Sequence, residues 1–75
     1  MSDNEGSPFV EFFYHFSLFR AYRDGGTTIA MDTGTWPFTD EATEMERFNT
    51  IYDHIQHTRP DLRGAVVIGY TIRPN

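Results

Sequence analysis

The sequence predicts a small α+β domain, a β-hairpin followed by one helix and a third strand (ββαβ). Two observations indicate a hairpin: an aromatic-rich, alternating segment begins near residue 9, and an Asp-Gly-Gly turn follows it. A third observation predicts the helix: the segment after residue 39 has a helical period of apolar residues. Because 75 residues leave room for only one domain, we expect a single domain over residues 9–75.

The first eight residues, MSDNEGSP, are polar and acidic. They bury too little apolar surface to offset the entropy of ordering, so a disordered tail is expected there. The first strand, residues 9–22, alternates between two faces. One face carries Phe12, Tyr14, Phe16 and Leu18, and the other carries Glu11, Phe13, His15, Ser17 and Phe19.

The turn between the first two strands contains glycines that tolerate positive φ. A two-residue loop, either Asp24-Gly25 or Gly25-Gly26, pairs even-numbered residues of the first strand with odd-numbered residues of the second. This parity predicts that Ile29 and Met31 join the Phe16 face, and that Asp32 shares a face with His15. The second strand is expected over residues 27–35, with Trp36-Pro37-Phe38 ending it.

The helix is predicted to begin after Thr43, which forms a capping box with Glu46. Its apolar stripe is Phe48, Ile51, Tyr52 and Ile55. Pro60 ends the helix.

The third strand is expected over residues 65–72, with Val66, Ile68, Tyr70 and Ile72 facing the helix. A sheet order of 2-1-3 is favoured because the first strand is apolar on both faces, as central strands are. The helix then covers one face of a three-stranded sheet.

Composition excludes several classes of protein. The net charge of −5 argues against phosphate neutralisation, so no nucleic-acid partner is expected. Without cysteine there is neither a disulfide nor a thiolate zinc site. The longest apolar run, residues 65–68, is far shorter than the roughly 20 residues that span a bilayer. We therefore expect no membrane partner, no cofactor and a cytoplasmic location.

Several short motifs resemble small uncharacterised proteins of actinobacteria and their phages over residues 14–75. They are His15-Phe16, Thr33-Gly34-Thr35, Ala42-Thr43, Phe48 with Ile51, and Pro74-Asn75. The spacing from Gly34 through Ala42-Thr43 to Phe48 is also similar. The sequence departs from that pattern at Trp36-Pro37-Phe38 and at residues 9–13. The resemblance implies a fold and a phage or mobile-element origin, and no activity.

Two sets of residues have the types that chemical sites use. On the helix, His54 and His57 with Asp53 have a spacing that can present metal ligands, but both histidines are expected to be solvated and no fourth ligand is evident. On the sheet, His15 and Asp32 with nearby Ser17 have the residue types of a hydrolase, yet no oxyanion site accompanies them. No catalytic residue and no metal site is therefore predicted.

The sheet face away from the helix is the predicted interaction site. Its predicted residues are Phe13, His15, Phe19, Ala30, Asp32, Val67 and Gly69. Such a patch is larger than an isolated domain usually exposes. It predicts a non-enzymatic, phage- or mobile-element-associated interaction module that binds itself or a host protein, unless the N-terminal tail or the Trp36-Pro37-Phe38 segment covers it.

The sequence is also compatible with two alternative functions. One is an acidic inhibitor that imitates DNA through Asp40, Glu41, Glu44 and Glu46. The other is a small metal-dependent or His/Asp hydrolase.

Overall fold

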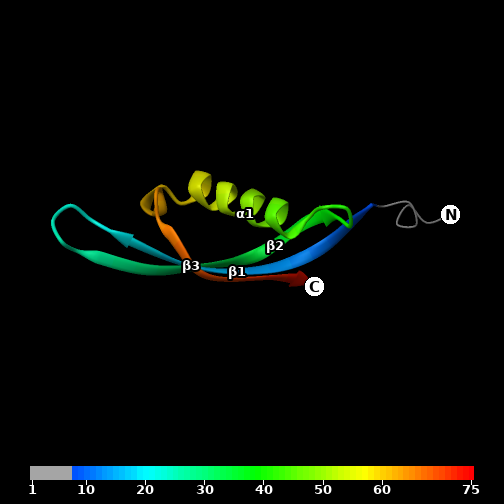
Figure 1. Cartoon of the computed structure of the whole chain (residues 1–75), viewed down its shortest axis with the longest axis horizontal. Helices are drawn as coiled ribbons and strands as arrows, with labels where there is room; N and C mark the ends of the chain where they lie inside the picture. The colour runs from blue at the N-terminus through cyan, green and yellow to red at the C-terminus, as the bar shows by residue number, and fades with distance from the viewer. Residues whose placement is uncertain (1–7) are drawn as a thin grey trace.

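The computed structural model describes residues 8–75 as a three-stranded antiparallel sheet with one helix on one face (Figure 1). In chain order the elements are β1 (Phe9–Ala21), β2 (Thr27–Thr39), α1 (Glu44–Thr58), the 3₁₀ helix η2 (Pro60–Leu62) and β3 (Val66–Pro74). The strand order β2-β1-β3 confirms the predicted topology. The tail predicted over residues 1–8 lies outside the described residues except for Pro8.

The hairpin turn differs from the prediction by one residue. Three residues form the loop, because the Tyr22 N–H donates to the Gly26 carbonyl at 2.7 Å and closes it. Gly25, at φ 93°, takes the left-handed position that a three-residue loop requires. The Asp24 carboxylate accepts from the Gly26 N–H at 2.9 Å and fixes the turn.

This extra loop residue reverses the predicted parity of β2. Even-numbered residues of β1 now pair with even-numbered residues of β2, as in Phe16 opposite Asp32 and Leu18 opposite Ala30. The predicted faces of Ala30 and Asp32, and of Ile29 and Met31, were therefore wrong. A shift of one residue moves every side chain of a strand to the other face.

β2 also continues four residues beyond its predicted end, through the segment Trp36-Pro37-Phe38. Trp36 pairs with Phe12, and Phe38 is buried against the ring of Phe12, with centroids 5.6 Å apart. This segment belongs to the sheet, so it does not form the lid that was considered over the outer face.

The helix forms as the sequence predicts. Thr43 is the N-cap, and both hydrogen bonds of the capping box with Glu46 are present. Ile51 and Ile55 are fully buried. Phe48 and Tyr52 pack at the edge of the core, which confirms the apolar stripe. The core between helix and sheet is completed by Phe12, Tyr14, Phe16, Leu18, Phe38, Leu62 and Ala65.

β3 contains a register shift opposite Ser17 and Leu18, because Gly69 pairs with Ser17 while Val67 pairs with Leu18. Ile68 is the additional residue of this bulge. Val67 consequently packs against the core, whereas Val66 and Ile68 are exposed. The prediction had Val66 and Ile68 facing the helix and Val67 on the outer side. Beyond the bulge Ile72 contacts the core, as predicted.

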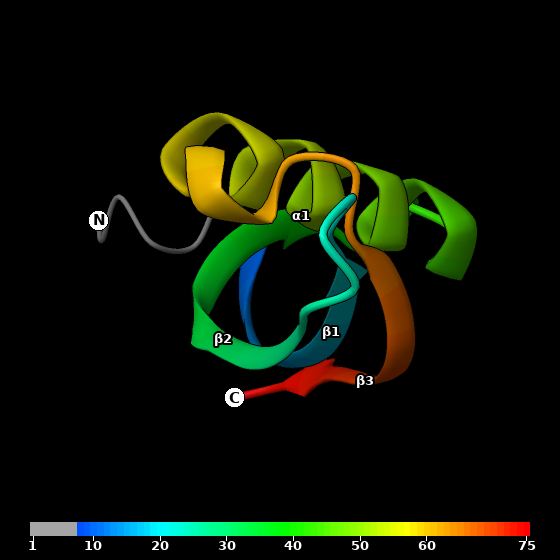
Figure 2. The same cartoon turned by 90° about the vertical axis from the view of Figure 1, so that its left-hand side faces the viewer.

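The helix lies on one side of the curved sheet, and the opposite side is open (Figure 2). The end of the hairpin that carries the turn extends past the helix (Figure 1). Within residues 8–75, no helix is long and apolar enough to cross a membrane.

Candidate functional site

The sheet face that points away from α1, here called the outer face, is built from odd-numbered residues of β1 and β2 with their partners on β3. The two pairing registers align these residues in rows across the three strands. Starting from the turn end, the rows are Ile29–Phe19–Val66, Met31–Ser17–Gly69, Thr33–His15–Thr71 and Thr35–Phe13–Arg73.

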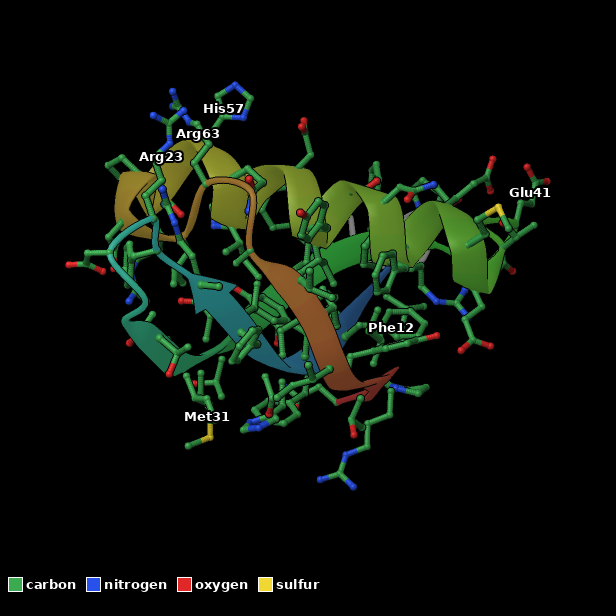
Figure 3. All side chains as sticks on the ribbon, turned by 60° about the vertical axis from the view of Figure 1, so that its left-hand side comes forward. Phe12, Arg23, Met31, Glu41, His57 and Arg63 are labelled. Carbon is green, nitrogen blue, oxygen red and sulfur yellow. The ribbon has the colours of Figure 1, made fainter. Side chains whose placement is uncertain are left out.

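The first two rows form an apolar cluster, defined as Phe19, Ile29, Met31 and Val66. Ile29, Met31 and Val66 expose 64, 63 and 61 % of their surface. Met31 points away from the helix (Figure 3). Large apolar side chains of this exposure are unremarkable singly, but here they are neighbours on one surface. The cluster is a candidate protein contact.

The middle of the outer face is polar. His15 Nε2 lies 3.4 Å from Ser17 Oγ, and His15 has threonines opposite it on both sides. In the last row the Arg73 guanidinium lies 5.7 Å from the centroid of the Phe13 ring. The adjoining row adds a carboxylate, because Glu11 lies opposite Pro37 and accepts from the Asn75 side-chain amide at 3.1 Å.

The predicted interaction residues are therefore divided between two faces. Phe13, His15, Phe19 and Gly69 lie on the outer face, while Ala30, Asp32 and Val67 lie on the helix side. Asp32 cannot orient His15, because the sheet separates them, and the proposed His/Asp dyad does not form.

The predicted interaction site did not include Ile29, Met31 and Val66, which the structure places on the outer face. The signal that identifies the first two is the turn sequence, because Asp24 two residues before Gly26 favours the turn that the longer loop contains.

On the helix side, Asp32 accepts a hydrogen bond from the hydroxyl of the buried Tyr14 at 3.1 Å. The Arg59 guanidinium lies 3.4 Å from the other Asp32 oxygen and also contacts Asp61. Burial, followed by the charge of Asp32 and the hydrogen bond to it, raises the pKa of Tyr14 to about 12. A neutral tyrosine is thus held as a donor, which is a structural role.

Gly34 makes room for this tyrosine. A Cβ at Gly34 would lie 2.9 Å from the Tyr14 hydroxyl and 3.0 Å from its ring. The glycine is therefore required by close approach of a side chain rather than by its backbone angles.

The helix residues considered for metal binding do not converge. His54 packs on the Trp36 indole with ring centroids 4.7 Å apart. Nδ1 of His57 lies 3.0 Å from the Asp53 carbonyl oxygen and 3.9 Å from the Asp53 carboxylate. Across residues 8–75, no three histidine or carboxylate side chains are grouped as a metal site.

The acidic residues at the start of α1 are partly engaged in local bonds. The Glu46 carboxylate accepts from the Thr43 N–H at 2.8 Å. The Glu44 carboxylate accepts from the Tyr70 hydroxyl at 2.8 Å, and this bond raises the pKa of Tyr70. Two of the four carboxylates therefore have a role in stabilising the fold.

Comparisons with protein-family models, with curated proteins and with solved structures found no match.

Proposed function

We propose that this chain is a non-enzymatic protein–protein interaction module of the cytoplasm that associates with a second copy of itself through its outer face. The observation that carries the proposal is the exposed apolar cluster in the first two rows of that face. Exposed apolar patches of this kind typically mark protein contacts.

A second copy is favoured as the partner by the charges of the outer face. The charged side chains of this face, Glu11 and Arg73, lie at the end away from the apolar cluster, and the two rows of the cluster contain none. Two such clusters can face each other across a two-fold axis without bringing like charges together. A strongly charged partner finds no complementary group at the apolar cluster.

The expected affinity follows from the exposed area. Complete burial of a large aliphatic side chain contributes about 1.5–3 kcal/mol, so Ile29, Met31 and Val66, already partly covered, contribute about 1–2 kcal/mol each. Both copies together then contribute roughly 6–12 kcal/mol, against an association cost of about 4–15 kcal/mol. This contact alone supports a weak association, with a dissociation constant in the micromolar range or higher.

The test is the mass in solution by light scattering, from low to high micromolar concentration. Val66→Glu and Met31→Glu place a charge in the apolar cluster and should shift the protein to smaller species that keep the wild-type circular dichroism spectrum. Met45→Glu is the matched control, because Met45 is 72 % exposed on α1. It should leave the mass unchanged.

Two results contradict the proposal. One is a wild-type protein that stays monomeric at about 500 µM, a concentration at which a complex of millimolar affinity is already partly formed. The other is an equal loss of mass in Met45→Glu and in the two cluster variants, which indicates a general effect of added charge.

A further inference from the structure

The outer edge of β2 carries unpaired backbone groups at every second residue. The Tyr22–Gly26 hydrogen bond closes the ladder on an even-numbered pair. In an antiparallel ladder hydrogen-bonded pairs alternate with non-bonded pairs, so the even-numbered residues of β2 bond to β1. The N–H and C=O groups of Thr27, Ile29, Met31, Thr33 and Thr35 therefore point away from the sheet.

This edge lacks the usual devices that prevent strands from adding to a sheet. Such devices are bulges, prolines and charged side chains. Pro37 is the one blocking residue, and it lies at an odd position where a missing N–H costs no bond to β1. Between Thr27 and Thr35 there is no bulge against β1, and Asp32, the one charged residue, faces the helix side.

The opposite edge of the sheet is protected. β3 is bulged at Ile68 and contains Arg73 and Pro74 within its nine residues. An unprotected edge of nine residues beside a protected one leaves the unprotected edge available to pair with a further strand.

We propose that β2 pairs with β2 of a second copy, antiparallel and centred on Met31, to give a continuous six-stranded sheet. This inference rests on the proposed self-association and names a second contact for it. The strand is nearly symmetric about Met31, because the pairs are Met31 with Met31, Ile29 with Thr33, and Thr27 with Thr35. These residues favour strands, and no like charges stand opposite each other.

Neighbouring registers are less favourable. Centring the pair on Asp32 sets two carboxylates opposite each other, which is destabilising. Centring it on Thr33 places Pro37 opposite Ile29 and loses ladder hydrogen bonds. In the register centred on Met31, the five odd-numbered residues of each copy form about ten backbone hydrogen bonds.

The two contacts are geometrically compatible. The two-fold axis of an antiparallel edge pair is perpendicular to the sheet, while the axis that brings outer faces together lies in its plane. Perpendicular two-fold axes that intersect generate a closed assembly of four chains. The helices then lie on the outside of two packed six-stranded sheets.

Amide hydrogen exchange tests the edge contact on the wild-type protein. The amides of Ile29, Met31, Thr33 and Thr35 should exchange at least about 100-fold more slowly than free edge amides, and their protection should fall on dilution. The amides of Tyr70 and Ile72 on the β3 edge are the control, because the β1–β3 register directs them away from β1.

Thr33→Pro removes one edge N–H without removing a bond to β1, as Pro37 already does. Thr33→Val is the control, since it keeps the N–H and a β-branched side chain. Light scattering should give the mass of four chains for wild type and Thr33→Val, and the mass of two chains for Thr33→Pro and for Val66→Glu.

The outcomes separate the two proposals. Edge pairing is overturned if the odd-numbered β2 amides exchange as fast as those of Tyr70 and Ile72, or if a folded Thr33→Pro keeps the wild-type mass. In either case, a loss of mass in Val66→Glu still supports the outer-face contact. A monomeric wild type overturns both.

Discussion

Gly34 on β2 gives the sharpest test of how the core is packed. Gly34→Ala places a Cβ 2.9 Å from the Tyr14 hydroxyl and 3.0 Å from ring carbons of a side chain that is 4 % exposed. The ring must shift, and its hydrogen bond to Asp32 is then lengthened or lost. Overpacking costs about 1–3 kcal/mol, and a lost hydrogen bond to a charged group costs about 1.5–3 kcal/mol.

The two costs overlap, so we expect Gly34→Ala to lower the free energy of unfolding by about 2–4 kcal/mol. This is a large part of the roughly 4–11 kcal/mol that a domain of this length has. Urea unfolding measures the loss, at a concentration where wild type and variants have the same mass. Gly69→Ala is the control, because a Cβ there meets no atom within 4 Å.

A double-mutant cycle locates the cause. In a Tyr14→Phe background the nearest clashing atom and the hydrogen bond are both absent, so Gly34→Ala should cost less than it does in wild type by about 1 kcal/mol or more. An equal cost in both backgrounds, or a cost no larger than that of Gly69→Ala, refutes the assigned role of Gly34.

Three further predictions concern stability. The pKa of Tyr14 is raised from 10.0 to about 12, so the contribution of its neutral hydroxyl to the free energy of unfolding is fully present below pH 10 and is lost as the pH rises towards 12. Urea unfolding at pH 8 and pH 11 should show this loss of stability in wild type and a smaller loss in Tyr14→Phe. Asp32→Ala should cost about 1–3 kcal/mol in the same assay at pH 7, since it leaves the buried hydroxyl without its acceptor, and a cost below that of Arg59→Ala contradicts this. Thr43→Ala should cost about 1 kcal/mol through loss of the helix cap, whereas Thr50→Ala, at an exposed position within α1, should cost nothing.

Local signals in the sequence were sufficient to predict the helix, the strands and the order of the strands in the sheet. The capping box at Thr43, the helix stripe and Pro60 each act within a few residues, and the structure contains all three features where they were expected. The central position of β1 followed from its apolar residues on both faces. Each of these features is fixed by contacts that short segments make whatever the rest of the chain does.

The assignment of residues to faces failed where it depended on counting residues between strands. Asp24-Gly25-Gly26 is compatible with loops of two or three residues, so the turn sequence alone does not decide the register. Burial of Trp36 and Phe38 on the helix side favours the longer loop, but these residues lie more than ten positions from the turn. The bulge at Ile68 is likewise set by packing against β1, which no local pattern of β3 reveals.

Both proposed contacts depend on that turn. With a three-residue loop, the odd-numbered residues of β2 combine two properties: their side chains lie on the outer face, and their backbone groups point to the free edge. A two-residue loop puts Ile29 and Met31 beneath the helix and turns Trp36 and Phe38 out to solvent, so the larger aromatic side chains decide which loop is stable. Burial of Trp36 and Phe38 therefore leaves Ile29 and Met31 exposed, and the candidate interaction surface results from the packing of the core.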